Sequence, residues 1–256
     1  MSYSQRQIFR LNSALKISRF LNGAVSPRYI VTTLHSDVEV IVSTTSDGSL
    51  RSSLQPYPQI DDAATQRFFQ RHDINSDQAV LLRLSYDTDD FCKYHEVTTD
   101  EIGAGFAQPQ LAIADGIVTR QAGVTMFLPI ADCIGAVLYH PPTRTLMLSH
   151  LGRHNLEQQG GEKSVEYLTK FGVKPDELLV YLSPAASKEH YPLYAFDNKS
   201  LHDVAVEQLI GSSVPSSNIT VDSRDTVTDP DFYSHSAALR GEKPRGRHAI
   251  VCYIRA

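Results

Sequence analysis

The sequence predicts an α+β fold in which mixed β-sheets carry helices on their outer faces. The 256 residues are 41% hydrophobic and 21% charged, values ordinary for a globular protein with a sizeable core. Apolar runs of strand length crowd the middle third of the chain, and helical segments do not alternate regularly with them. That order disfavours a doubly wound parallel sheet. No internal repeat and no long linker divides the chain, so we expect residues 1–256 to form a single domain.

Local patterns place each element. Runs rich in Val, Ile and Leu, bounded by turn residues, predict two strands within residues 28–43 and further strands at 79–85, 111–119, 124–130, 135–140, 145–149, 178–183, 218–222 and 248–254. Asp61 or Asp62 is the expected cap of a short helix that runs to Arg71. Further helices are predicted at 155–171, with Gly172 as the C-cap, and at 200–211, although Gly160-Gly161 is unfavourable inside the former.

Charge and cysteine content narrow the class of protein. The net charge of −5 and a pI near 6.0 disfavour a nucleic-acid-binding surface but allow a small anionic substrate. The three cysteines are widely spaced, which is typical of a reducing compartment and not of a disulfide framework. No apolar run approaches the roughly 20 residues of a membrane span, and no signal peptide is evident. We therefore expect a cytoplasmic protein.

The residues most suggestive of chemistry are Cys133 and His150. Between them lie a strand, the turn Pro141-Pro142-Thr143 and a second strand, and such a hairpin brings its two ends together. If His95 from another short β-prone segment joins them, one thiolate and two imidazoles form a set suited to Zn²⁺ with an open fourth position. A metal-free reading lets His150 activate Cys133 as a nucleophile. An inert buried cysteine and a solvated histidine are the alternative to both.

The stretch around these residues resembles the YfiH-like laccase-domain family, also described as multicopper polyphenol oxidase or peptidoglycan-editing-factor type. Residues 114–119 (ADGIVT), 130–133 (IADC) and 150–152 (HLG) resemble three of its motifs, and residues 182–186, 232–235 and 246–247 resemble others more faintly. The departures are Arg153-His154-Asn155 in place of Trp-Arg-Gly, and a first motif, Tyr94-His95-Glu96, without its Gly. Asp87 is the other candidate for the first-motif position, but its spacing to Asp115 suits the family less well than that of His95.

The resemblance implies a zinc-dependent purine nucleoside phosphorylase that acts on adenosine and inosine, with possible adenosine deaminase activity. It makes His95, Cys133 and His150 the metal ligands. Asp132 is then the candidate proton shuttle, although a structural carboxylate that bonds the turn is an equal alternative. Arg153 and Arg247, with Lys188, are candidates for phosphate binding. Copper fits less well than zinc, because the ten histidines show no paired His-x-His spacing.

Two other functions stay open. Cys133 and His150 could form a cysteine hydrolase or amidase acting on a cell-wall precursor. The altered motifs could instead mark a catalytically degenerate member that binds a ligand or partner. We expect a small-molecule substrate, a nucleoside with phosphate, and neither nucleic acid nor membrane as a partner.

Overall fold

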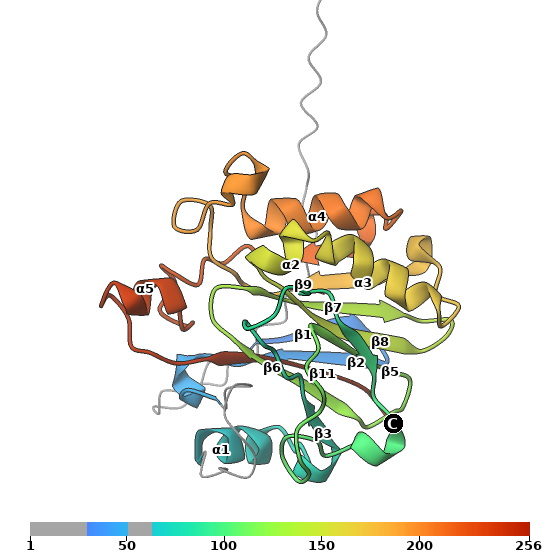
Figure 1. Cartoon of the computed structure of the whole chain (residues 1–256). Coiled ribbons are helices and arrows are strands. Elements are labelled where there is room, and N and C mark those ends of the chain that lie inside the picture. Colours follow the sequence, from blue (N-terminus) through green and yellow to red (C-terminus); the bar gives the residue numbers. More distant parts are fainter. Residues whose placement is uncertain (1–29, 51–62) are drawn as a thin grey trace, which may run out of the picture.

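Two stacked β-sheets with helices on their outer sides make up the described part of the chain, residues 30–50 and 63–256, in the computed structural model (Figure 1). The five-stranded sheet has the order β1 (Ile30–His35), β2 (Val38–Val42), β11 (His248–Ile254), β6 (Thr125–Ile130), β3 (Ala79–Leu81). The six-stranded sheet has the order β10 (Ile219–Val221), β9 (Leu179–Leu182), β7 (Ile134–His140), β8 (Thr145–Leu151), β5 (Gly116–Thr119), β4 (Tyr94–Glu96). The helices are α1 (Ala63–Arg71), α2 (Arg153–Glu157), α3 (Gly160–Thr169), α4 (Leu201–Gly211) and α5 (His235–Leu239).

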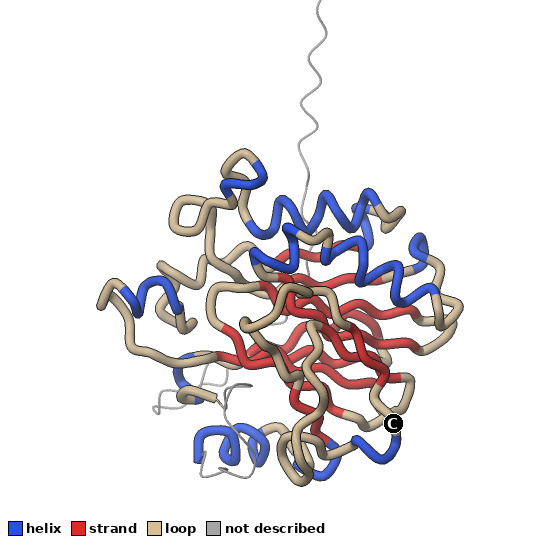
Figure 2. Tube along the Cα trace, viewed as in Figure 1, coloured by secondary structure: helices blue, strands red, loops and turns tan. Residues whose placement is uncertain are grey.

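Both sheets are mixed, as predicted. In the five-stranded sheet β11 runs antiparallel to β2 and β6, whereas β3 runs parallel to β6. In the six-stranded sheet β7 and β8 form an antiparallel hairpin, whereas β9 pairs with β10, and β4 with β5, in parallel. Figure 2 shows the strands stacked between helical segments above and below them.

Strand alternation produces three apolar layers. On β11, Ile250 and Cys252 enter the layer between the sheets, whereas Val251 points to the opposite face and packs with Phe68 of α1. Leu168 of α3 and Leu209 of α4 belong to the layer that covers the outer face of the six-stranded sheet. The prediction of mixed sheets with helices on their outer faces is therefore confirmed.

Some elements differ from the sequence prediction. The helix expected over 155–171 is broken into α2 and α3 at Gln159, whose φ of 64° is left-handed. Gly160 is needed there, because a Cβ at that position would lie 1.7 Å from Asn155 Oδ1. The strand expected over 79–85 ends at Leu81, α5 was not predicted, and the proposed caps Asp61 and Asp62 lie outside the described residues.

No helix within the described ranges is long and apolar enough to cross a membrane. Within the same ranges, all three cysteines carry free thiols, and Cys252 is fully buried in the layer between the sheets.

Candidate functional site

The β7–β8 hairpin brings Cys133 and His150 together, as the sequence predicted. Gly135 pairs with His150, and Ile134 with Leu151, so Cys133 immediately precedes the paired region at the end where His150 lies. A Cβ placed on Gly152 would lie 2.9 Å from His150 Cε1 and 3.0 Å from Cys133 Sγ. Both side chains therefore contact one point, and the glycine at position 152 leaves room for them.

His150 is buried with its polar atoms unused. The residue is 5% exposed, and neither Nδ1 nor Nε2 has a hydrogen-bond partner among the described residues. Burial lowers the pKa of this imidazole to about 4, so it is neutral at pH 7. A buried, neutral imidazole without a partner is free to bind a metal ion or to bond a ligand.

Cys133 is a thiol in the metal-free chain. Burial raises its pKa to about 12, and the negative charge of Asp132 acts in the same direction. The positive charges of Arg247 and Arg153 oppose this shift but do not overcome it. The thiolate–imidazolium pair that a cysteine nucleophile needs is therefore disfavoured with His150 as the base.

Both side chains open into a cavity of about 480 Å³ at the edge where the two sheets meet, a size usual for small-molecule sites. The cavity lining includes the apolar and aromatic residues Leu84, Tyr86 and Tyr191, called here the aromatic wall. Arg153, the first residue of α2, and Arg247, just before β11, line it as well. The cavity thus joins an aromatic wall to two guanidinium groups.

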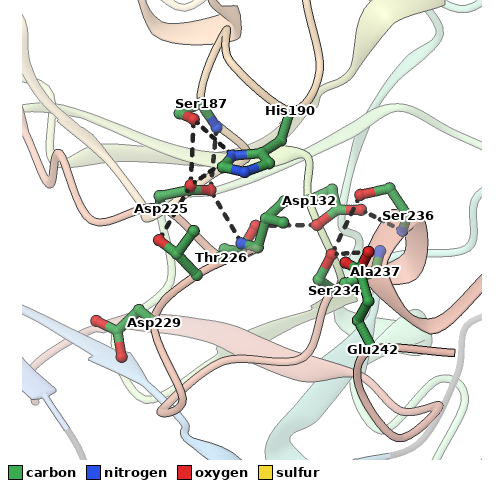
Figure 3. Close-up of polar contacts among 12 residues, drawn as sticks. Asp132, Ser187, His190, Asp225, Thr226, Asp229, Ser234, Ser236, Ala237 and Glu242 are labelled. Carbon is green, nitrogen blue, oxygen red and sulfur yellow. Dashed lines mark hydrogen bonds and ion pairs between the residues drawn. The ribbon is translucent and has the colours of Figure 1, made fainter. Parts of the chain in front are cut away.

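Asp132 lies in the same cavity with its carboxylate fully engaged. Its Oδ1 accepts a hydrogen bond from Thr226 Oγ1 at 3.0 Å, and its Oδ2 accepts one from the Ser236 backbone N–H at 2.7 Å (Figure 3). The residue itself has a left-handed φ of 78°, which Asp tolerates better than most side chains. This geometry supports the structural reading, in which Asp132 ties the β6–β7 turn to α5 and to the loop that carries Thr226.

His95 does not join the other two predicted ligands. It lies on the edge strand β4, level with Ile117 of β5 and through it with Leu148 of β8. Its Nε2 is 2.8 Å from Glu101 Oε2, and it does not line the cavity. In residues 30–50 and 63–256, no group of three or more His, Cys, Asp or Glu side chains could hold a metal ion. The described residues therefore supply two of the three expected donors.

The two remaining candidate residues, Lys188 and Asp87, also lie outside the lining of the cavity. Lys188 lines a different hollow, beside the start of α4, and not the cavity of Cys133. Asp87, the other candidate for the first motif, does not line the cavity, although Tyr86 beside it does.

The sequence analysis assigned no role in the site to several residues that line the cavity. Phe91 and His154 stack with their ring centroids 4.8 Å apart and their planes at 20°. Asn155 is buried and donates from Nδ2 to the Phe91 carbonyl at 2.7 Å. The altered segment at residues 153–155 therefore builds part of the cavity wall. Its departure from the family pattern was the signal that could have identified it.

Comparison with known proteins identifies the family. The family model described as multi-copper polyphenol oxidoreductase laccase matches residues 52–197. The chain belongs to this family. The resemblance inferred from the motifs is thereby confirmed.

Relatives named purine nucleoside phosphorylase share only part of this chain. The purine nucleoside phosphorylase YlmD of Bacillus subtilis is 24% identical over 173 residues, which cover 56% of this chain and 61% of the relative. A purine nucleoside phosphorylase of Deinococcus radiodurans is 25% identical over 108 residues, 42% of each chain. The matched part of the chain thus corresponds to about half the length of these curated relatives.

Two solved structures match most of the chain. The hypothetical protein YfiH of Bacillus licheniformis superposes with a TM-score of 0.75 at 16% identity, covering 90% of this chain and 98% of that one. YlmD from Geobacillus stearothermophilus superposes with a TM-score of 0.74 at 19% identity, covering 91% and 98%. At such identities the likeness establishes the fold.

Proposed function

We propose that this cavity binds a purine nucleoside together with phosphate and that the chain is a purine nucleoside phosphorylase. The observation that carries the proposal is the meeting of an aromatic wall and two guanidinium groups around Cys133 and His150 in one cavity. A purine base is flat and apolar on its faces, so it suits the aromatic wall. Phosphate is a dianion, and arginine binds its oxygens in pairs. The names of the relatives support the same substrate class.

Each of the residues that line the cavity has a separate role in the proposed reaction. In phosphorolysis a phosphate oxygen bonds to C1′ of the ribose, the glycosidic bond breaks, and the purine leaves with the bonding electrons and gains a proton. Arg153 and Arg247 would hold the phosphate and neutralise its charge as it attacks. Tyr86 and Tyr191 would hold the base, and His150 has an N–H free to bond the substrate.

Zinc dependence is a separate proposal. Cys133 and His150 are a thiol and an unpartnered buried imidazole, and both are ligand types that zinc prefers. Catalytic zinc sites usually have three protein ligands, and the described residues provide only these two. We therefore derive no reaction step from a metal. Elemental analysis of the purified chain tests whether zinc, or copper as the less suitable ion, is bound.

The test is phosphate-dependent base release. Purified chain is incubated with adenosine or inosine, with and without phosphate and with and without added zinc, and products are separated by chromatography. We expect adenine or hypoxanthine together with ribose 1-phosphate, only when phosphate is present. Inosine formed from adenosine would reveal the proposed deaminase activity. No turnover in any condition would overturn both activities.

Arginine variants localise the activity. Arg153→Ala and Arg247→Ala should each lower kcat/KM for phosphate on the order of a hundredfold, because each removes a guanidinium that binds the phosphate oxygens. Arg120→Ala is the matched control, since that side chain is half exposed and pairs with Glu96 away from this cavity. An equal loss in all three variants would contradict the assignment.

A second candidate is a binding protein without turnover. It is favoured by the engaged carboxylate of Asp132, which has both oxygens bonded, and by the position of His95 on the edge strand. Calorimetry with inosine would then show binding in the absence of product formation. The hydrolase reading has the least support, because the protonation states of Cys133 and His150 oppose it. Activity that survives a chelator but not an alkylating reagent would restore it.

A further inference from the structure

The Cys133–His150 pair is faced by a third side chain, which is a tyrosine. The ring centroids of Tyr86 and His150 are 6.4 Å apart with their planes at 87°. Tyr86 lines the same cavity and lies within electrostatic reach of Cys133 and Arg247. The residue is 57% exposed, so its side chain stands at the mouth of the cavity and not in the core.

Strand pairing explains why residue 86 arrives there. β3 runs parallel to β6 with Leu81 opposite Phe127, and the Leu82 N–H donates to the Phe127 carbonyl at 2.9 Å. Two parallel strands end at the same edge of a sheet. Continued by the same number of residues, the register places Tyr86 level with Asp132, the neighbour of Cys133. Three segments of the chain therefore meet at this edge, and they carry Cys133, His150 and Tyr86.

The same kind of reasoning explains why His95 is remote. His150 lies two strands away from β4, and His95 is level with Leu148, two residues before His150. With strands about 4.8 Å apart and about 3.3 Å per residue, the Cα atoms of His95 and His150 are separated by roughly 12 Å. The ring of His95 is also bonded to Glu101.

Asp132, His154 and His235 line the same cavity, but the groups that face one another at the pair are a thiol, an imidazole and a phenol. Zinc sites in proteins are built from Cys, His and carboxylate ligands, and a phenol is not among these ligand types. We propose that Tyr86 stands beside Cys133 and His150 where a third zinc ligand would be, without being a ligand itself. The native site consequently binds zinc weakly through two donors, and a histidine at position 86 completes it. This inference concerns metal binding and does not depend on the phosphorylase activity.

The experiment is a gain of zinc affinity. The Kd for Zn²⁺ is measured by competition with a chromophoric chelator for the wild type, Tyr86→His and Tyr86→Phe. Outer-sphere partners alone change metal affinity by about 10–100-fold, so an added direct ligand in Tyr86→His should tighten binding at least tenfold. Tyr86→Phe should leave the weak affinity unchanged. Cobalt in Tyr86→His should show a thiolate charge-transfer absorption that Cys133→Ser removes.

His95→Ala is the control that separates the two assignments, and its zinc affinity should equal that of the wild type. Wild-type binding as tight as that of Tyr86→His would overturn the inference. So would weaker binding in Tyr86→Phe, which would make the phenol a ligand, or in His95→Ala. Because Tyr86 is exposed, we expect Tyr86→His to fold, and thermal unfolding checks this. Tyr86→Cys tests the same gain with a second ligand type.

Discussion

Gly152→Ala should push apart the pair on which the site depends. The φ of Gly152 is −106° and its ψ is 178°, a conformation that alanine adopts without strain, so the effect comes from space alone. The added methyl would lie 2.9 Å from His150 Cε1 and 3.0 Å from Cys133 Sγ, closer than carbon and sulfur atoms pack. His150 is 5% exposed and cannot swing into solvent. Overpacking of this kind costs about 1–3 kcal/mol.

Urea unfolding and calorimetric titration with inosine measure the effect of Gly152→Ala. We expect a loss of about 1–3 kcal/mol in the free energy of unfolding, together with weaker binding of inosine. Gly211→Ala is the matched control, because a methyl group at that position would have nothing within 4 Å of it and the residue ends α4. That variant should be as stable as the wild type, or more stable by up to about 1 kcal/mol. If Gly152→Ala matched the wild type in both measurements, the close packing of Cys133 and His150 would be refuted.

Three further predictions concern the stability of the folded chain. Asp132→Ala removes the acceptor of the Thr226 and Ser236 hydrogen bonds and should lower the free energy of unfolding by roughly 2–4 kcal/mol in urea titrations; native stability with abolished turnover would instead indicate a catalytic carboxylate. The pKa of His150 is lowered to about 4 by burial, so its unfolded form binds more protons, and the contribution of this residue to stability should fall by about 3 kcal/mol as the pH drops from 6.5 to 4. In urea titrations at several pH values a His150→Gln variant should lack this contribution and keep the one from His248, whose pKa burial also lowers. Lys243 Nζ donates to three backbone carbonyls, so Lys243→Met should cost about 1–3 kcal/mol, and an unchanged urea midpoint would show that water replaces the amine.

The sequence predicted what local patterns determine. The apolar runs flanking Pro141-Pro142 predict the β7–β8 hairpin, and a hairpin fixes which residues meet at its open end, so Cys133 and His150 were found together. The strands of the middle third followed from the same runs. The break at Gln159 was only suggested by the two glycines beside it, because its cause is the packing of Asn155 against Gly160.

The pairing of strands that are distant in the sequence could not be predicted from local patterns. Tyr86 reaches the cavity because β3 pairs in parallel with β6, and no local pattern records that partner. His95 was selected by its spacing to Asp115, yet spacing along the chain does not determine how far into a strand a residue falls or which strand neighbours it. From the sequence, Asp132 could be a proton shuttle or a structural carboxylate. Only the positions of Thr226 and Ser236 in the structure distinguish the two.

The most direct test of the central claim is a crystal structure of the chain soaked with inosine and phosphate. We predict the purine against Tyr86 and Tyr191, the phosphate between Arg153 and Arg247, and the ribose beside His150. Ligand bound at any other place, with this cavity left to solvent, would contradict the assignment of the site.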